Sequence, residues 1–74
     1  MKIYLPIKIT NFKLYNEVLP QLSEYYLNGG MENPIISFIN TEKINYECIP
    51  LIMGILDIIY NVNEEPVFLE FVYR

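Results

Sequence analysis

The residues best suited to chemistry stand together in the stretch "NYECIPLIMG", residues 45–54. Tyr46, Glu47 and the only cysteine, Cys48, directly precede an apolar run. A cysteine near the start of a helix gains thiolate character, but a cysteine hydrolase also needs a base, normally histidine. The chain contains no histidine. We therefore expect Cys48 to be a buried or incidental side chain, because free cysteine is among the most buried residue types.

Carboxylates near the C-terminal end are the second group with possible chemistry. Asp57, Glu64, Glu65 and Glu70 could form an acid–base pair or bind Mg²⁺. The segment "NVNEEP" has the polar, turn-forming composition of a solvated loop, which is the interpretation we favour. One cysteine without histidine also excludes the common zinc sites. The sequence therefore predicts a protein that is not an enzyme and that has no cofactor or metal.

Charge and hydrophobicity narrow the class of partner. The 74 residues carry a formal net charge of −4, and only Lys43 is basic between Leu14 and Tyr73. Nucleic-acid binding requires clustered lysine and arginine, and amphipathic membrane helices are usually rich in both. The longest apolar run is too short to span a bilayer, and "MKIYLPIKIT" lacks the features of a signal peptide. We expect a single cytoplasmic domain, residues 1–74, that binds neither nucleic acid nor membrane.

The first half of the chain predicts a strand followed by a helix. Apolar and polar residues alternate over 2–10, and Pro6, which lacks an N–H donor, favours an edge position. Residues 16–28 have helical spacing. A helix beginning at Asn11 would place Pro20 in its interior, so we predict Asn16 as the N-cap and Gly29-Gly30 as the stop.

The second half predicts strands over about 35–39 and 66–73, with a helix over about 47–61 between them. A helix that begins near Glu47 or Cys48 holds Pro50 in its first turn without losing a hydrogen bond. The order β-α-β-α-β predicts an α/β fold: a small, mostly parallel sheet in a two-layer or three-layer unit. The residues "ITNFKLY" could add a hairpin strand.

The predicted helix 47–61 is apolar over more of its circumference than a small sheet covers. Its polar residues fall in one narrow wedge, and its apolar arc spans roughly 200°, twice the ~100° stripe that one-sided packing needs. The sheet can cover the centre of the arc: Ile52, Ile55, Leu56 and Ile59. Two flanks remain, Leu51 with Ile58 and Met53 with Tyr60. We expect a protein partner to cover them, either another protein or a second copy in a homodimer.

The segment "PIISFINTEKINYECIPLIMGIL" resembles the central part of STAS domains, a fold shared by anti-sigma-factor antagonists and the cytoplasmic tails of sulfate transporters. Ile35 and Ile36 match the family's apolar strand, and Ser37-Phe38 stand where that strand ends in Asp-Phe. Ile44 matches the Ile of the family's Ile-Asp-Ser-Ser-Gly-Leu-Gly turn, and Asn45 stands in the place of its Asp. The resemblance covers about residues 16–72.

The resemblance implies a non-catalytic regulatory domain that docks on an ATPase or kinase-like partner through this turn. Tyr46 and Glu47 replace the two serines of the turn, one of which is the family's phosphoacceptor. Glu47 would instead supply a permanent negative charge. The expected docking residues are Asn45, Tyr46, Glu47, Cys48, Leu51 and Ile58. The alternative is a small phage or mobile-element inhibitor that binds a host defence protein directly, since short length, acidity and tyrosines also suit that class.

Overall fold

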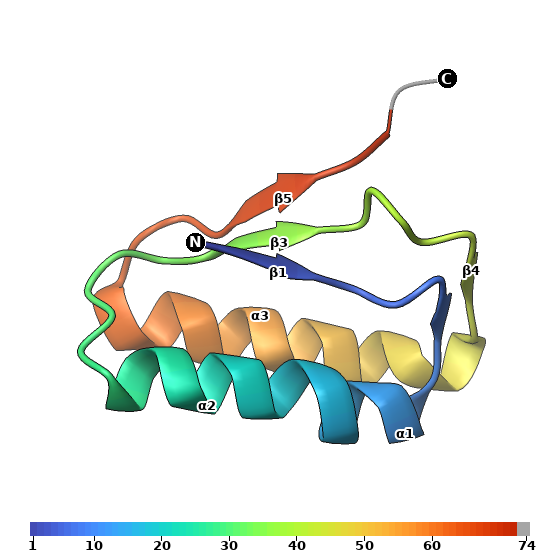
Figure 1. Cartoon of the computed structure of the whole chain (residues 1–74), viewed down its shortest axis with the longest axis horizontal. Coiled ribbons are helices and arrows are strands. Elements are labelled where there is room, and N and C mark those ends of the chain that lie inside the picture. The colour runs from blue at the N-terminus through green and yellow to red at the C-terminus, as the bar shows by residue number, and fades with distance from the viewer. Residues whose placement is uncertain (73–74) are drawn as a thin grey trace.

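A three-stranded parallel sheet forms one layer of the protein. The computed structural model describes residues 1–72, and the sheet order is β1-β3-β5 (Figure 1). The strands are β1 (Lys2–Tyr4), β3 (Ile35–Ser37) and β5 (Phe68–Glu70). Their register aligns Ile3, Ile36 and Leu69 in one row. The predicted α/β class is confirmed, with β1 at an edge and β3 at the centre.

All three strands are shorter than predicted. The expected strand 2–10 ends at Tyr4, and Lys8–Ile9 form a separate short strand, β2, which pairs in parallel with β4 (Lys43–Ile44). Pro6 separates β1 from β2, because it has no N–H for a ladder. No hairpin strand forms from "ITNFKLY", since the chain is helical from Asn11.

Turns and loops set the limits of β3 and β5. The expected strand 35–39 ends at Ser37 because the chain turns, the N–H of Thr41 donating to the carbonyl of Phe38 at 3.0 Å. Within the expected strand 66–73, only 68–70 are strand. The last residue of that range, Tyr73, lies outside the described residues.

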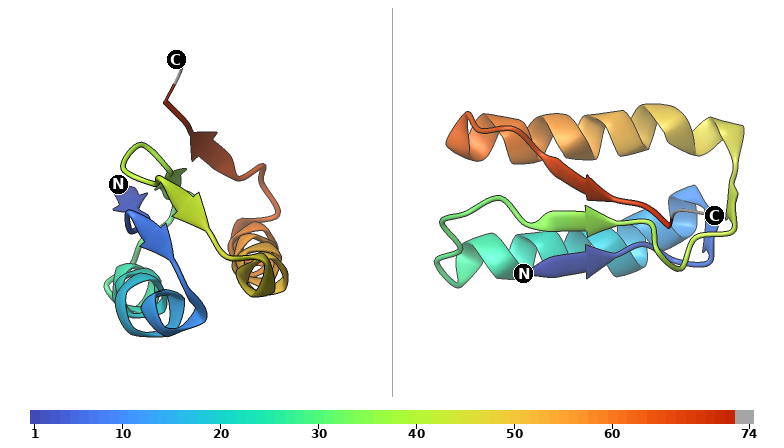
Figure 2. Two further views of the ribbon diagram at one scale, coloured as in Figure 1. Left: turned by 90° about the vertical axis from the view of Figure 1, so that its right-hand side faces the viewer. Right: turned by 90° about the horizontal axis from the view of Figure 1, so that it is seen from above.

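Both long helical segments lie against the same face of the sheet (Figures 1 and 2). Each links neighbouring parallel strands, and the two crossovers proceed in the same direction across the sheet. Crossovers of one hand then place their helices on one side. The protein is therefore a two-layer unit, and no second helical layer covers the other sheet face within residues 1–72.

The first helical segment begins at Asn11, earlier than the predicted residue 16. It comprises α1 (Asn11–Lys13), a π-helical turn η1 (Leu14–Val18) and α2 (Leu19–Leu27). Thr10 is the N-cap, because its Oγ1 accepts a hydrogen bond from the Lys13 N–H at 3.2 Å. The side-chain amide of Asn16, the predicted cap, instead donates to the carbonyl of Phe12 at 2.7 Å.

Pro20 does not prevent this early start, so that part of the prediction was wrong. In η1 the N–H of Leu19 donates to the carbonyl of Leu14, five residues back, and Pro20 follows at the start of α2. The wider π turn accommodates the proline ring that an uninterrupted α-helix would exclude. The predicted stop is confirmed, because the chain leaves the helix after Leu27 and Gly29 adopts a φ of +87°.

The second helix follows the predicted course closely. A 3₁₀ turn, η2 (Tyr46–Cys48), leads into α3 (Ile49–Asn63), and Pro50 lies in the first turn. The helix ends two residues beyond position 61, where Glu64 adopts left-handed geometry and its N–H donates to the Tyr60 carbonyl at 2.7 Å. None of the helices in residues 1–72 combines the length and apolar character needed to cross a membrane.

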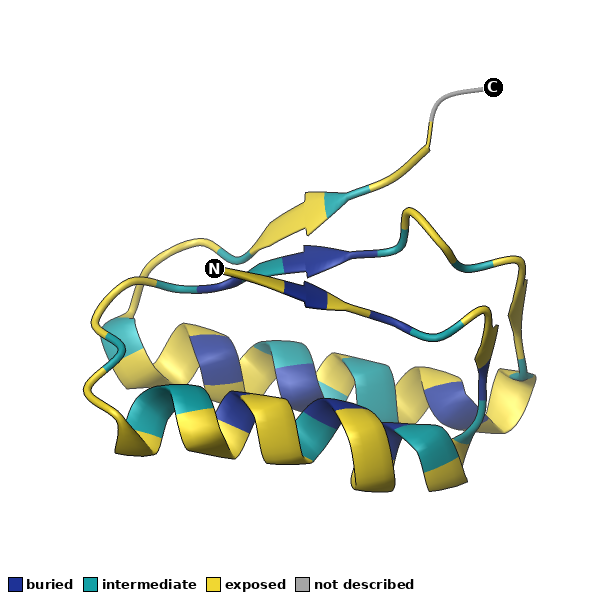
Figure 3. Ribbon diagram, in the orientation of Figure 1, coloured by how far each residue is buried: buried dark blue, intermediate teal, exposed yellow. Residues whose placement is uncertain are grey.

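The hydrophobic core lies between the sheet and the two helices (Figure 3). The sheet contributes Ile3 and Ile36, and α3 contributes Ile55 and Ile59, all buried. Ile52 and Leu56 are partly buried against the same cluster, so the predicted centre of the α3 arc is confirmed. The remaining buried members are Leu5, Ile9, Leu14, Val18, Leu22 and Cys48.

A polar bridge crosses the sheet face that is turned away from the helices. The buried hydroxyl of Ser37 donates to Glu70 Oε1 at 2.6 Å, and the ammonium of Lys2 donates to Oε2 at 2.7 Å. The hydrogen bonds from Lys2 and then Ser37 lower the pKa of the Glu70 carboxyl. The same contact with Glu70 raises the pKa of Lys2. The bridge thus ties β5 to the central strand and links the two edge strands to each other.

Candidate docking site

The turn before α3 is fastened to the core by Cys48. Its side chain is fully buried, and its Sγ lies 3.5 Å from the carbonyl oxygen of Ile9. The N–H of Cys48 donates to the carbonyl of Asn45 at 3.1 Å, and the N–H of Asn45 donates to Ile9 at 3.3 Å. The expectation of a buried cysteine is confirmed. Cys48 therefore cannot belong to the docking surface, where the sequence also placed it, and instead holds the turn in position.

Tyr46 and Glu47 project from this turn into solvent. The Tyr46 side chain is 89% exposed, Glu47 is also exposed, and Asn45 is half-buried. An aromatic ring exposed to this degree contributes little to the stability of the fold, because its apolar surface remains in water. The buried cysteine beneath it fixes the backbone from which the ring projects. The turn therefore presents an aromatic and a carboxylate on a rigid base.

The flanks of α3 are exposed to different degrees. Met53, Ile58 and Tyr60 are each about half exposed, as the apolar arc predicted, whereas Leu51 is partly buried against the core. Ile49, which the sequence prediction did not include, is 48% exposed. Residues 46, 49, 53 and 60 follow helical spacing, so the exposed turn continues into one apolar stripe. We call residues 46, 49, 53 and 60 the α3 stripe.

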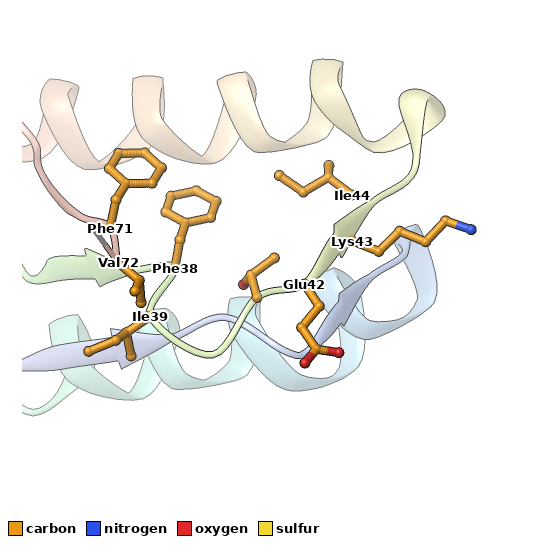
Figure 4. A pocket seen from close by; sticks show the side chains of 8 residues that line it. Phe38, Ile39, Glu42, Lys43, Ile44, Phe71 and Val72 are labelled. Atoms are coloured by element: carbon orange, nitrogen blue, oxygen red, sulfur yellow. The ribbon is translucent and has the colours of Figure 1, made fainter. Parts of the chain in front are cut away.

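A cavity opens beside the turn, at the carboxyl ends of β3 and β5. Its volume is about 440 Å³ (Figure 4). The rings of Phe38 and Phe71 stack in parallel, with centroids 4.9 Å apart and planes inclined by 8°. Figure 4 shows Ile44 extending toward the two rings from β4. The lining residues are Phe38, Ile39, Thr41, Glu42, Lys43, Ile44, Phe71 and Val72.

Sequence reasoning did not find this cavity, because its walls come from distant segments. Phe38 follows β3, Ile44 lies in β4, and Phe71 follows β5. A general rule could have revealed the cavity: ligands of open α/β sheets bind beyond the carboxyl ends of the strands. Applied to the predicted strands, that rule points to residues just after 37 and 70.

The carboxylates considered for catalysis do not form a site. Asp57, Glu64 and Glu65 are exposed, and Glu70 is occupied by its bonds to Lys2 and Ser37. Among residues 1–72, no three cysteine or carboxylate side chains lie in an arrangement that could hold a metal ion.

Comparison of the chain with protein-family models, with curated proteins and with solved structures found no match.

Proposed function

We propose that the protein is a non-catalytic regulatory module that docks on another protein through the 45–51 turn and the start of α3. The observation that carries this proposal is the exposed Tyr46 ring on a turn anchored by buried Cys48. Aromatic side chains presented on a rigid surface are typical anchors of protein interfaces. In the free protein the Tyr46 ring lies in water, and binding of a partner would bury it.

The surroundings of Tyr46 support a contact larger than one side chain. The α3 stripe extends the apolar surface along the helix, and Ile44, one residue before the turn, lines the cavity. Exposed apolar side chains that gather on one part of a surface often mark interaction sites. The sequence resemblance to STAS domains supports the same turn as the docking point, with Glu47 carrying a constant negative charge where that family has a serine.

Affinity capture with single substitutions tests the proposal. The tagged chain captures proteins from its native host, and the captured set is compared with those of Tyr46→Ala and Glu47→Arg. Matched controls are Tyr15→Ala, an exposed tyrosine of the first helical segment, and Glu24→Arg, an exposed carboxylate of α2. All four changes are at the surface and should alter stability by less than about 0.5 kcal/mol.

We expect one captured protein to be lost with Tyr46→Ala and Glu47→Arg and retained with both controls. Equal retention by all four variants would show that the turn is not the docking point. The identity of the captured protein separates the regulatory role from the alternative, a phage or mobile-element inhibitor of host defence. Light scattering of the pure chain at several concentrations tests whether the partner is a second copy.

A further inference from the structure

Two lysines lie side by side next to the cavity. Lys8 and Lys43 are register partners in the parallel pair β2–β4, and both are exposed. Like charges at directly neighbouring positions of a sheet repel each other. The one salt bridge in the described part of the chain joins Lys2 to Glu70, so neither of these lysines is in an ion pair there. In a chain of net charge −4, the two lysines together with the adjacent Glu42 leave one excess positive charge at this place.

The lysine pair borders the cavity rather than filling it. Lys43 is one of the lining residues, and its ammonium group points away from the rings of Phe38 and Phe71 (Figure 4). The carboxylate of the neighbouring Glu42 points in a different direction and also away from the rings (Figure 4). The site therefore combines aromatic and aliphatic walls with a charged rim, on which Lys8 and Lys43 outnumber Glu42.

We infer, on the basis of the proposed docking function, that the partner contributes a short acidic segment that carries an aromatic or large aliphatic side chain. That side chain enters the cavity between Phe38, Phe71 and Ile44, and the adjacent carboxylates lie against Lys8 and Lys43. A cavity of about 440 Å³ is within the range of pockets that bury small ligands, roughly 300–1,000 Å³. Apolar anchors in pockets with charged rims are typical of interface hot spots.

Charge complementarity favours an acidic protein segment over a nucleic acid. Nucleic-acid affinity comes mainly from neutralising several phosphates, and each requires its own cation. Two adjacent lysines on an acidic protein cannot meet that need. They suffice to pair with one or two carboxylates beside an apolar anchor.

Titration of the ¹⁵N-labelled full chain with defined peptides tests the inference. The probe is the peptide Asp-Asp-Phe-Glu-Asp. One control peptide replaces its acidic residues by lysine, and the other replaces phenylalanine by serine. We expect only the probe to shift the amide resonances of residues 41–44, 71 and 72, with weaker binding as NaCl rises from 50 to 500 mM. No selective shift at millimolar probe, or equal binding of either control peptide, overturns the inference, as does tighter binding of a short single-stranded DNA.

A charge reversal supplies the matched comparison. Lys43→Glu should weaken binding of the probe by about five- to tenfold, because it removes one ion pair and introduces repulsion. The double variant Gln21→Glu/Ser23→Asp lowers the net charge by the same two units at exposed positions of α2. Equal weakening by both would show a general charge effect and overturn the inference.

Capture of the native partner by two variants distinguishes failure of this inference from failure of the docking function on which it rests. Loss of capture with Tyr46→Ala but undiminished capture with Lys43→Glu at 50 mM NaCl contradicts the inference and leaves the docking function standing. Loss with both variants supports both. Retention with both contradicts both.

Discussion

Two adjacent isoleucines of α3 should respond differently to the same substitution. Ile59 is fully buried in the core, whereas Ile58 is 52% exposed on the flank. Removing one methylene from a buried side chain costs about 0.8 kcal/mol of transfer free energy, and Ile→Val in cores costs about 0.5–1.5 kcal/mol. We therefore expect Ile59→Val to lower the free energy of unfolding by about 1 kcal/mol. Ile58→Val, at about half the burial, should lower it by about 0.4 kcal/mol.

Truncation to alanine should widen the difference. Ile59→Ala removes three carbons, about 2.4 kcal/mol of transfer free energy, and leaves a cavity, so we expect about 3 kcal/mol in total. Ile58→Ala should cost about 1 kcal/mol, because the flank is open to water and no closed cavity forms. For a chain of this size, 1 kcal/mol corresponds to about 4–8 °C in Tm.

Urea unfolding followed by far-UV circular dichroism measures all four variants. The valine pair keeps the comparison usable if Ile59→Ala fails to fold, since domains of this size have a total stability of only about 4–11 kcal/mol. Equal losses for Ile58→Val and Ile59→Val, or a larger loss at Ile58, would refute the orientation of α3 and with it the exposed flank.

Three further measurements test other parts of the structure. Because the pKa of Glu70 is lowered in the folded state, the stability it contributes is present above the ordinary glutamate pKa, about 4.3, and is lost as the pH falls through its folded value. Urea unfolding between pH 7 and 2 should show this acid loss diminished in Lys2→Met, and an unchanged loss contradicts the bridge. A Cβ at Gly30 would lie 2.5 Å from the Tyr25 ring, so Gly30→Ala should cost about 1–2 kcal/mol in the wild-type background and little in Tyr25→Ala. Buried Cys48 should react with a thiol reagent on the order of 100-fold more slowly in native buffer than in urea, and rapid native labelling would show that the turn is not fastened.

The strongly patterned elements could be predicted from the sequence. Periodicity placed the second helix, and Pro50 fixed its start, because a proline is tolerated only in the first turn. The same reasoning failed at Pro20, where the helix continues through a π turn. Propensity rules assume α-helical geometry and do not anticipate a local change of helix type. The cap at Thr10 was missed as a consequence.

Only the part of the candidate site whose residues are neighbours in the sequence was predicted. Tyr46 and Glu47 follow one another in sequence, so their exposure could be inferred from the boundary of the helix. The cavity depends on Phe38 and Phe71, which meet through the pairing of β3 with β5. Distance across a sheet is set by register, which single-sequence patterns do not determine. Cys48 was predicted as a docking residue, but its side chain is buried and does not reach the surface.

The spacing of the strands has a consequence for the order in which the molecule assembles. Lys2 pairs with Ile35 and Ile35 with Phe68, a separation of 33 residues each time (35 − 2 and 68 − 35). No hairpin nucleates the main sheet, so each pairing must await closure of a loop that contains a whole helix. Local helix formation is faster by orders of magnitude. During synthesis, therefore, the central strand keeps one edge unpaired until Phe68–Glu70 has left the ribosome, and nascent chains are most prone to associate in that interval.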